Sequence, residues 1–370
     1  MKLIAKQIFF LFSLIAIITT VVTSQSNLFF SSFIEAESRN KFSSELFLQM
    51  ISSENHYFRK NLELEEEPLF TAAIRFVTNI NIKDVRSLIF DEIPGLYIHS
   101  SEIIVAGEGT DFTNLPFESA PPMEELLKDR EVLEESLEHI DDSVPKNIPQ
   151  PEKNTVFIYH SHNRESFIPH LKDTNSATTA QHKDINITLV GQRFGEKLIE
   201  KGIGAQVDTT DIAAILGERN LKYGHSYNIS REVVQEAMVT NKDLMYFIDI
   251  HRDSARRETT TTTINGETYA KLFFVLGKSQ PNYEQNEQFA IELNNRIKEK
   301  YPNLTRGIVR KARDGRNNGI YNQDLSPNSI IIEIGGPENT LDEMYRTVDI
   351  LAEIFAEYYW EDAVEVSGNS

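Results

Sequence analysis

Residues 156–166 read Val-Phe-Ile-Tyr-His-Ser-His-Asn-Arg-Glu-Ser, an apolar run that leads directly into two imidazoles and a carboxylate. The apolar part is too short for a helix and is rich in residues that favour strands, so the pattern predicts a buried strand. Ligand-binding residues of an open α/β sheet lie just outside the carboxyl ends of its strands. The stretch therefore predicts a site at that edge, with His160, His162 and Glu165 as candidate ligands. His160 and His162 would share one face if the strand continued through them.

Two further apolar runs carry polar side chains in the same way. Residues 244–250 are followed at once by His251, and residues 329–334 contain Glu333 within an otherwise apolar run. An ionised carboxylate is costly to bury in a strand unless it is paired, bound to a metal or kept protonated. Three predicted strands therefore bring His, Glu, His and Glu toward one site.

This set of residues is the one that a zinc hydrolase needs. Such a site uses three protein ligands, leaves one position for water and has a separate carboxylate as general base. The chain contains no cysteine, so a zinc ion would be held by His and carboxylate ligands. The alternative interpretation is that each histidine is a hydrogen-bonded structural residue at a strand end. A zinc peptidase with His-Glu-x-x-His on a helix is not indicated, because the sequence contains no such run.

The formal net charge of the 370-residue chain is −19. This charge argues against nucleic acid as a partner, because binding to phosphates depends on Lys and Arg. It also gives no electrostatic attraction to anionic membranes or wall polymers, so such an association would need a specific site or an anchor.

The N-terminal segment has the pattern of a membrane anchor. Lys2 and Lys6 precede an apolar stretch at residues 8–22. A span of about 30 Å of hydrocarbon needs roughly 20 residues, and the apolar character can continue past residue 22. Residues 1–25 are therefore predicted to form an uncleaved single-span anchor with its N-terminus in the cytoplasm; a cleaved signal peptide is the alternative.

The remaining chain divides by composition. Residues 26–67 are polar and acidic and predict a stalk, and residues 68–110 predict a small N-terminal domain without a catalytic constellation. Residues 111–153 contain prolines and many acidic residues, which is typical of a solvated linker. Residues 154–363 alternate strand-like and helix-like segments, a pattern that predicts an α/β domain.

Turn and cap residues give approximate bounds within that domain. Ser230 is predicted to cap a helix that starts at residue 231. The other predicted elements are strands at 205–208 and 270–276, a hairpin at 259–266, and helices at 187–201, 284–301 and 341–359.

Several of these runs together resemble a known family. The chain is similar to the stage II sporulation protein P family of endospore-forming bacteria, in particular in residues 159–167, 248–254, 321–325 and 332–336. The resemblance implies an α/β fold with an amidase-like mixed sheet flanked by helices, preceded by the membrane-anchor helix and the small N-terminal domain.

The resemblance also implies a function. Family members are membrane-anchored, zinc-dependent N-acetylmuramoyl-L-alanine amidases that degrade peptidoglycan while the mother-cell membrane engulfs the forespore, and an endopeptidase activity is ascribed to them as well. They act with stage II sporulation proteins D and M. The chain is accordingly expected in the cell membrane as a single-pass protein whose catalytic domain is extracytoplasmic.

Residue roles follow from the resemblance by position. His162 and His251 correspond to the histidine ligands of Zn²⁺, Glu165 corresponds to the carboxylate ligand, and Glu333 corresponds to the catalytic glutamate. Amidase relatives place their second ligand on a helix well after the first histidine.

This chain departs from that pattern, because it offers only Asn186 and Thr188 there, which are poor zinc ligands. His160 and His182 therefore remain alternatives to Glu165. The choice between His160 and His162 also stays open. Arg252 is a candidate for holding the developing oxyanion or a carboxylate of the substrate, with a structural salt bridge as the alternative.

A different class of function is also compatible with the fold. The domain could be a catalytically silent, amidase-like scaffold that recruits other wall hydrolases. The presence of all four candidate groups argues against this interpretation, because a scaffold is under no constraint to keep them.

Overall fold

The computed structural model describes residues 101–116, 120–138, 149–313 and 317–368. The chain divides into two units, residues 1–94 and residues 95–370, and the described residues all belong to the second. The predicted anchor, the stalk and most of the predicted N-terminal domain lie outside them. Among the helices of the described ranges, none has the length and apolar character that a membrane span requires.

The described unit is built on a mixed seven-stranded sheet. Four neighbouring strands, β9, β4, β2 and β3, are parallel, whereas β7 runs antiparallel to β9 and β1 antiparallel to β8. In order across the sheet the strands are β1 (Ser101–Ala106), β8 (Thr305–Lys311), β7 (Leu272–Gly277), β9 (Ser329–Ile334), β4 (Tyr246–His251), β2 (Asn154–Tyr159) and β3 (Gly204–Val207). The prediction of a mixed sheet flanked by helices is confirmed.

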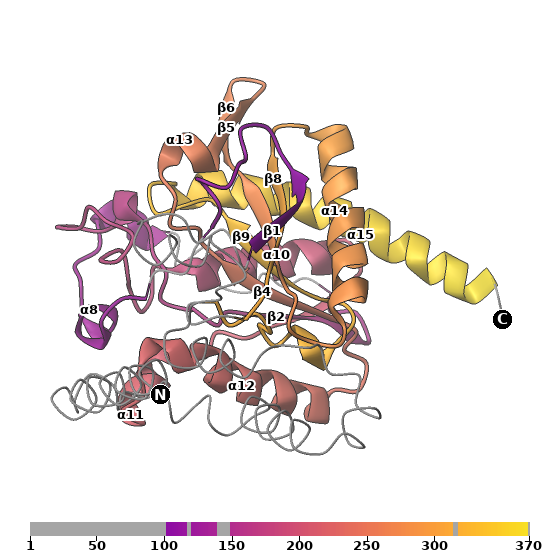
Figure 1. Ribbon diagram of the computed structural model, residues 1–370, viewed down its shortest axis with the longest axis horizontal. Coiled ribbons are helices and arrows are strands. Elements are labelled where there is room, and N and C mark those ends of the chain that lie inside the picture. Colours follow the sequence, from indigo (N-terminus) through magenta and orange to yellow (C-terminus); the bar gives the residue numbers. More distant parts are fainter. Residues whose placement is uncertain (1–100, 117–119, 139–148, 314–316, 369–370) are drawn as a thin grey trace, which may run out of the picture. The chain divides into compact units, whose positions relative to one another are not determined.

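Helices cover both faces of this sheet. α10 (Ile187–Glu200) and α14 (Tyr283–Lys300) pack on strands of the sheet, and α15 (Leu341–Gly368) contacts both of these helices on the same face. α12 (Ser226–Thr240) lies on the opposite side of β2 and β4 from α10 (Figure 1), and α11 (Ile212–Glu218) packs against α12. The shorter elements are α8 (Met123–Leu127), η2 (Glu134–Leu137), η3 (Ile168–His170), η4 (Tyr223–His225), α13 (Arg257–Thr260), β5 (Thr261–Ile264), β6 (Glu267–Ala270) and η5 (Gln323–Leu325).

Alternation along β4 separates the core from the polar site. Ile248 and Ile250 belong to the large apolar cluster that includes residues of α10, α14 and α15, whereas Phe247 packs with residues of α12. Successive side chains of a strand point to opposite faces, so Asp249 and His251 share the face of Phe247. The sheet therefore presents its functional side chains on the α12 face.

Most predicted elements inside the domain are present close to their expected bounds, but the helix predicted to begin after Ser230 begins at Ser226. Ser230 is 1% exposed, and its hydroxyl lies 2.7 Å from that of Ser161. Its side chain therefore takes part in a tertiary contact, and it does not cap the helix.

The described parts of two predicted segments belong to the α/β unit. β1, expected in the N-terminal domain of residues 68–110, pairs with β8 at the edge of the sheet. α8, expected in the linker of residues 111–153, packs against α11, and its Leu126 is 1% exposed. Both contacts join residues far apart in the chain, so composition alone could not predict them.

The first turn of α15 contains a buried carboxylate that holds α13. Glu343 is 3% exposed and accepts hydrogen bonds from both terminal nitrogens of Arg257, from Asn339 Nδ2 at 2.8 Å and from the backbone nitrogen of Thr340 at 3.1 Å. Burial by itself raises the pKa of Glu343, but these hydrogen bonds outweigh it and lower the pKa to about 2.

Glu343→Gln is expected to reduce the acid sensitivity of the fold. A carboxyl group whose pKa is lower in the folded than in the unfolded state stabilises the fold above the unfolded pKa, and that stability is lost as the pH falls toward the folded pKa. The wild type should therefore lose up to about 3 kcal/mol more unfolding free energy than the variant between pH 4.5 and pH 2. Urea unfolding of both proteins at several pH values measures the difference, and parallel curves would contradict it.

Candidate metal centre

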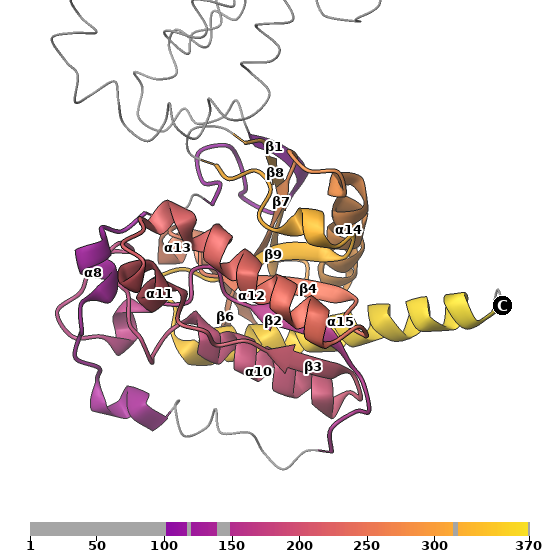
Figure 2. The ribbon, with the colours of Figure 1, turned by 90° about the horizontal axis from the view of Figure 1, so that it is seen from below.

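Three buried side chains come together where β2 and β4 end. They are His162 and Glu165, from the turn after β2, and His251, the last residue of β4. β2 and β4 are neighbouring parallel strands, so both chain segments leave the sheet at the same edge (Figure 2). One nitrogen of each histidine and one oxygen of the carboxylate all lie within 4.8 Å of one another. Residues predicted from separate strands therefore meet in one cluster.

The geometry of this cluster fits a zinc ion. His162 Nδ1 lies 3.6 Å from Glu165 Oε1, and His251 Nδ1 lies 3.9 Å from Glu165 Oε2. Zinc–ligand bonds of 2.0–2.2 Å in tetrahedral geometry correspond to ligand separations of about 3.4 Å. The three side chains are between 2% and 5% exposed. Small movements of the side chains would bring all three donor atoms to bonding distance.

Backbone groups of Arg252 and His162 orient Glu165. Its Oε2 accepts a hydrogen bond of 2.8 Å from the backbone nitrogen of Arg252, and its own backbone nitrogen donates to His162 O at 3.0 Å. Burial by itself raises the pKa of Glu165, but the neighbouring imidazoles of His162 and His251 outweigh it and lower the pKa to about 2. Glu165 is thus an ionised carboxylate, as a metal ligand must be.

His251 has a carboxylate on each side of its ring. Nδ1 faces Glu165, while Nε2 lies 2.9 Å from Asp249 Oδ1. Burial by itself lowers the pKa of His251, but the negative charges of Asp249, Glu165 and Glu333 outweigh it and raise the pKa to about 10. Without a metal, the protonated imidazole therefore compensates the negative charge of the surrounding carboxylates. A bound metal cation would supply that positive charge instead.

Glu333 lies beside the three candidate ligands. It stands on β9 directly opposite His251 in the parallel register, and its Oε2 is buried with no hydrogen-bond partner among the described residues. Burial, with the charges of Asp253 and Glu165, raises the pKa of Glu333 to about 8, against the opposing effect of His251. A carboxylate with a pKa near neutrality is suited to take up and return a proton.

His160 and His182, the two alternative ligands that the sequence offered, make other contacts. β2 ends at Tyr159, so His160 and His162 do not share a strand face. His160 Nδ1 contacts the carbonyl of Asp208 at 3.0 Å, and burial lowers the pKa of His160 to about 4. His182 Nδ1 accepts from the backbone nitrogen of Ile185 at 2.9 Å. Within the described ranges, neither histidine belongs to the ligand cluster.

The Arg252 side chain is directed to a neighbouring loop. Its terminal nitrogens donate to the carbonyls of Asp253, Ala177 and Ala180 at 3.1–3.3 Å. The guanidinium therefore holds the loop before α10, and the contact of Arg252 with the ligand cluster is made by its backbone nitrogen. The geometry gives Arg252 a structural part and does not support the predicted oxyanion role.

Comparison with known proteins identifies the family. A family model described as stage II sporulation protein P matches residues 83–356. Stage II sporulation protein P of Bacillus subtilis (strain 168) is 41% identical over 334 residues, which cover 88% of this chain and 83% of the relative. The chain belongs to the stage II sporulation protein P family. This membership supports a role in sporulation.

A solved structure is also similar to part of this family member. It is the N-acetylmuramyl-L-alanine amidase Ami1 from Mycobacterium smegmatis, which is 11% identical and matches with a TM-score of 0.33 over 57% of this chain and 98% of Ami1.

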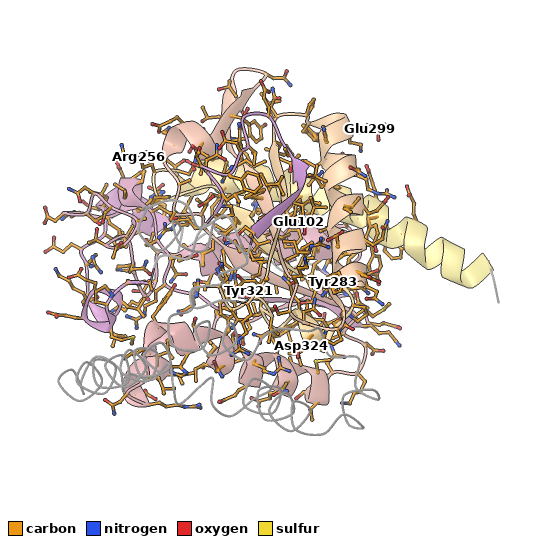
Figure 3. All side chains as sticks on the ribbon, viewed as in Figure 1. Glu102, Arg256, Tyr283, Glu299, Tyr321 and Asp324 are labelled. Carbon is orange, nitrogen blue, oxygen red and sulfur yellow. The ribbon has the colours of Figure 1, made fainter. Side chains whose placement is uncertain are left out.

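In this member of the stage II sporulation protein P family, aromatic rings that sequence reasoning missed pack on the ligands. Tyr223 stacks on His162 with ring centroids 4.6 Å apart, and Tyr227 stacks on His251 at 6.2 Å. Tyr321, labelled in Figure 3, contacts Tyr227 edge to face at 5.3 Å. The signal available in the sequence was the spacing of Tyr223 and Tyr227, four residues apart, which places them on one side of a helical segment.

The segment that carries Tyr321 has an unusual backbone. Tyr321 and Asn322 have φ angles of 54° and 58°, in the left-handed region that non-glycine residues rarely adopt. Such conformations persist only where the surrounding structure holds them, and they gather at functional sites. Asn322 is held by a 3.0 Å hydrogen bond from its Nδ2 to Ser230 Oγ.

Proposed function

We propose that this chain is a zinc-dependent peptidoglycan hydrolase, an N-acetylmuramoyl-L-alanine amidase of sporulation. The observation that carries the proposal is the convergence of His162, Glu165 and His251 within 4.8 Å, with Glu333 opposite His251 in the sheet. Two neutral nitrogen ligands, one carboxylate and a separate general base form the set that a hydrolytic zinc site uses.

The roles of the residues follow from their positions. His162, Glu165 and His251 would hold Zn²⁺, and their burial keeps competing ligands away. A zinc ion bound there supplies Lewis-acid activation of water and of the scissile amide carbonyl. The hydrogen bond from the Arg252 backbone nitrogen keeps Glu165 in place while substrate binds and leaves.

Glu333 would act as the general base and then as the general acid. Its raised pKa lets it accept a proton from the attacking water and return that proton to the leaving amine. Because Glu333 is on a central strand of the sheet, its distance from His251 is set by backbone pairing. The proton acceptor is therefore positioned before substrate arrives.

The substrate and the cellular setting rest on family membership. We propose that the bond cut is the amide between the glycan and the stem peptide of septal peptidoglycan during engulfment, with endopeptidase cutting of cross-links as a further activity. The basic and apolar pattern of residues 1–25 supports a single-pass anchor and an extracytoplasmic catalytic domain. Stage II sporulation proteins D and M remain predicted partners, on the resemblance alone.

The full-length protein, loaded with zinc, is expected to release free stem peptides that begin with L-alanine from purified peptidoglycan. Mass spectrometry of the soluble products distinguishes this cut from cross-link cleavage, which leaves the stem attached to the glycan. Removal of zinc by a chelator should abolish release, and added zinc should restore it.

Two results would count against the proposal. If the folded, zinc-loaded protein releases nothing, even with the predicted partner proteins present, the scaffold interpretation is favoured. If products form equally well after complete removal of the metal, zinc dependence is excluded.

A further inference from the structure

A third carboxylate lies behind the ligand cluster, where no role has been assigned to it. Asp249 is 0% exposed and stands in the middle of the apolar strand β4, two residues before His251. A buried carboxylate in such a strand requires strong partners, because removing it from water is costly. The groups around Asp249 therefore show which residues stabilise its charge and which residues it can orient.

Asp249 contacts both halves of the ligand set. Its Oδ1 lies 2.9 Å from His251 Nε2, on the side of the ring opposite Glu165. The backbone nitrogen of Ser161 donates to Oδ1 at 2.9 Å, and the Ser161 hydroxyl donates to Oδ2 at 2.6 Å. Ser161 immediately precedes His162, so one carboxylate joins the end of β4 to the start of the turn that carries His162 and Glu165.

The other end of this contact is fixed to α12. Ser161 Oγ lies 2.7 Å from Ser230 Oγ, and Ser230 Oγ accepts from Asn322 Nδ2 at 3.0 Å. All of these groups are less than 5% exposed. These protein groups hold the Asp249 side chain in place without a contribution from a metal ion.

We infer that Asp249 is a positioning residue of the metal centre, which orients His251 and the His162 turn for ligation. This inference rests on the proposed function. His251 can use Nδ1 as a ligand only if the proton of its neutral ring is on Nε2, and a carboxylate beside Nε2 selects that tautomer. Nε2 lies within hydrogen-bond distance of Asp249 Oδ1, but it makes no aligned hydrogen bond to any residue that the structure describes. A small rotation of the imidazole completes the bond.

Asp249→Asn tests this role with little change in shape. The variant keeps an oxygen that can accept from Ser161, but it loses the charge beside His251. Loss of an outer partner of this kind typically weakens metal binding by about 10–100-fold. We expect an increase of that size in the zinc dissociation constant of the full chain, measured by competition with a chromophoric chelator, and a changed visible spectrum of the Co²⁺-substituted protein.

Glu343→Gln is the matched control. Glu343 is also a buried carboxylate with several hydrogen bonds, but its partners belong to α13 and to residues 339–340, just before α15. The control should lower thermal stability and leave the zinc dissociation constant and the Co²⁺ spectrum unchanged. The zinc-induced gain in stability should fall in Asp249→Asn by about 1.4 kcal/mol for each tenfold loss of affinity, and it should stay intact in the control.

Each outcome decides the inference. A folded Asp249→Asn protein that binds zinc within twofold of the wild type overturns it and leaves the proposed function intact. A wild type that binds no zinc overturns both. If Asp249→Asn does not fold, Ser161→Ala decides, because it removes the hydroxyl that donates to Asp249 Oδ2 and contacts Ser230 Oγ, and it keeps the backbone donor to Oδ1. Zinc binding at least fivefold weaker in Ser161→Ala supports the role of Asp249, and unchanged binding overturns it.

Discussion

Glu333→Gln is expected to lower the rate of peptidoglycan hydrolysis by about 10²–10⁴-fold, the range that a general acid–base group contributes. Glutamine has nearly the same shape, but it can neither accept nor return a proton. The raised pKa of Glu333 marks it as the proton acceptor of the site, and its place opposite His251 puts it beside the candidate ligands. Glu333 is not one of the clustered ligands, so zinc should remain bound.

The measurement is the initial rate of stem-peptide release at saturating peptidoglycan, with bound zinc determined on the same samples. Glu343→Gln provides the control for the loss of a carboxylate elsewhere in the fold, and it should retain the wild-type rate at neutral pH. A zinc-loaded Glu333→Gln protein with a rate within tenfold of the wild type would exclude Glu333 as the general base.

His251→Ala is expected to abolish stoichiometric zinc binding, and activity with it. The substitution removes one of three donors and takes the imidazole away from both Glu165 and Glu333. Because loss of an outer partner already costs about 10–100-fold in metal affinity, the loss of a direct ligand should exceed that range. Zinc content after dialysis and titration calorimetry with zinc give the two readouts.

His160→Ala is the matched control for this experiment. His160 is as deeply buried as His251 and comes from the same edge of the sheet, but its Nδ1 is used by the Asp208 carbonyl and its ring packs near Gly191. It should bind zinc like the wild type, even if its stability falls. Equal loss of zinc in both variants would show that the ligand set differs from His162, Glu165 and His251.

Local patterns in the sequence were sufficient to predict the strands that carry the site. Residues 156–159, 244–250 and 329–334 are short apolar runs, and each contains or precedes His or Glu. Burial and strand formation depend mainly on such runs, so β2, β4 and β9 were predictable, and parallel pairing then brings their ends together. That reasoning brought His160, His162, Glu165 and His251 toward one site, and it left the choice between His160 and His162 open.

Other features depend on contacts that no local pattern contains. β1 has no signal that assigns it to the sheet, because its pairing partner, β8, is some 200 residues away in the chain. Arg252 was interpreted as a possible catalytic cation, yet its guanidinium is taken by carbonyls of a loop whose path is set by tertiary packing. Asp249 was visible only as an acid in an apolar strand.

The sequence by itself determined the chemical types at the site: two histidines and two glutamates at the ends of buried strands, with no cysteine as an alternative. Only the tertiary structure decided that His162, and not His160, joins His251, because β2 ends at Tyr159 and the chain turns there. It also decided that Glu165 is held by a backbone nitrogen 87 residues away. Residue types follow from the chain, but the direction of each side chain is fixed by partners that folding brings from distant segments.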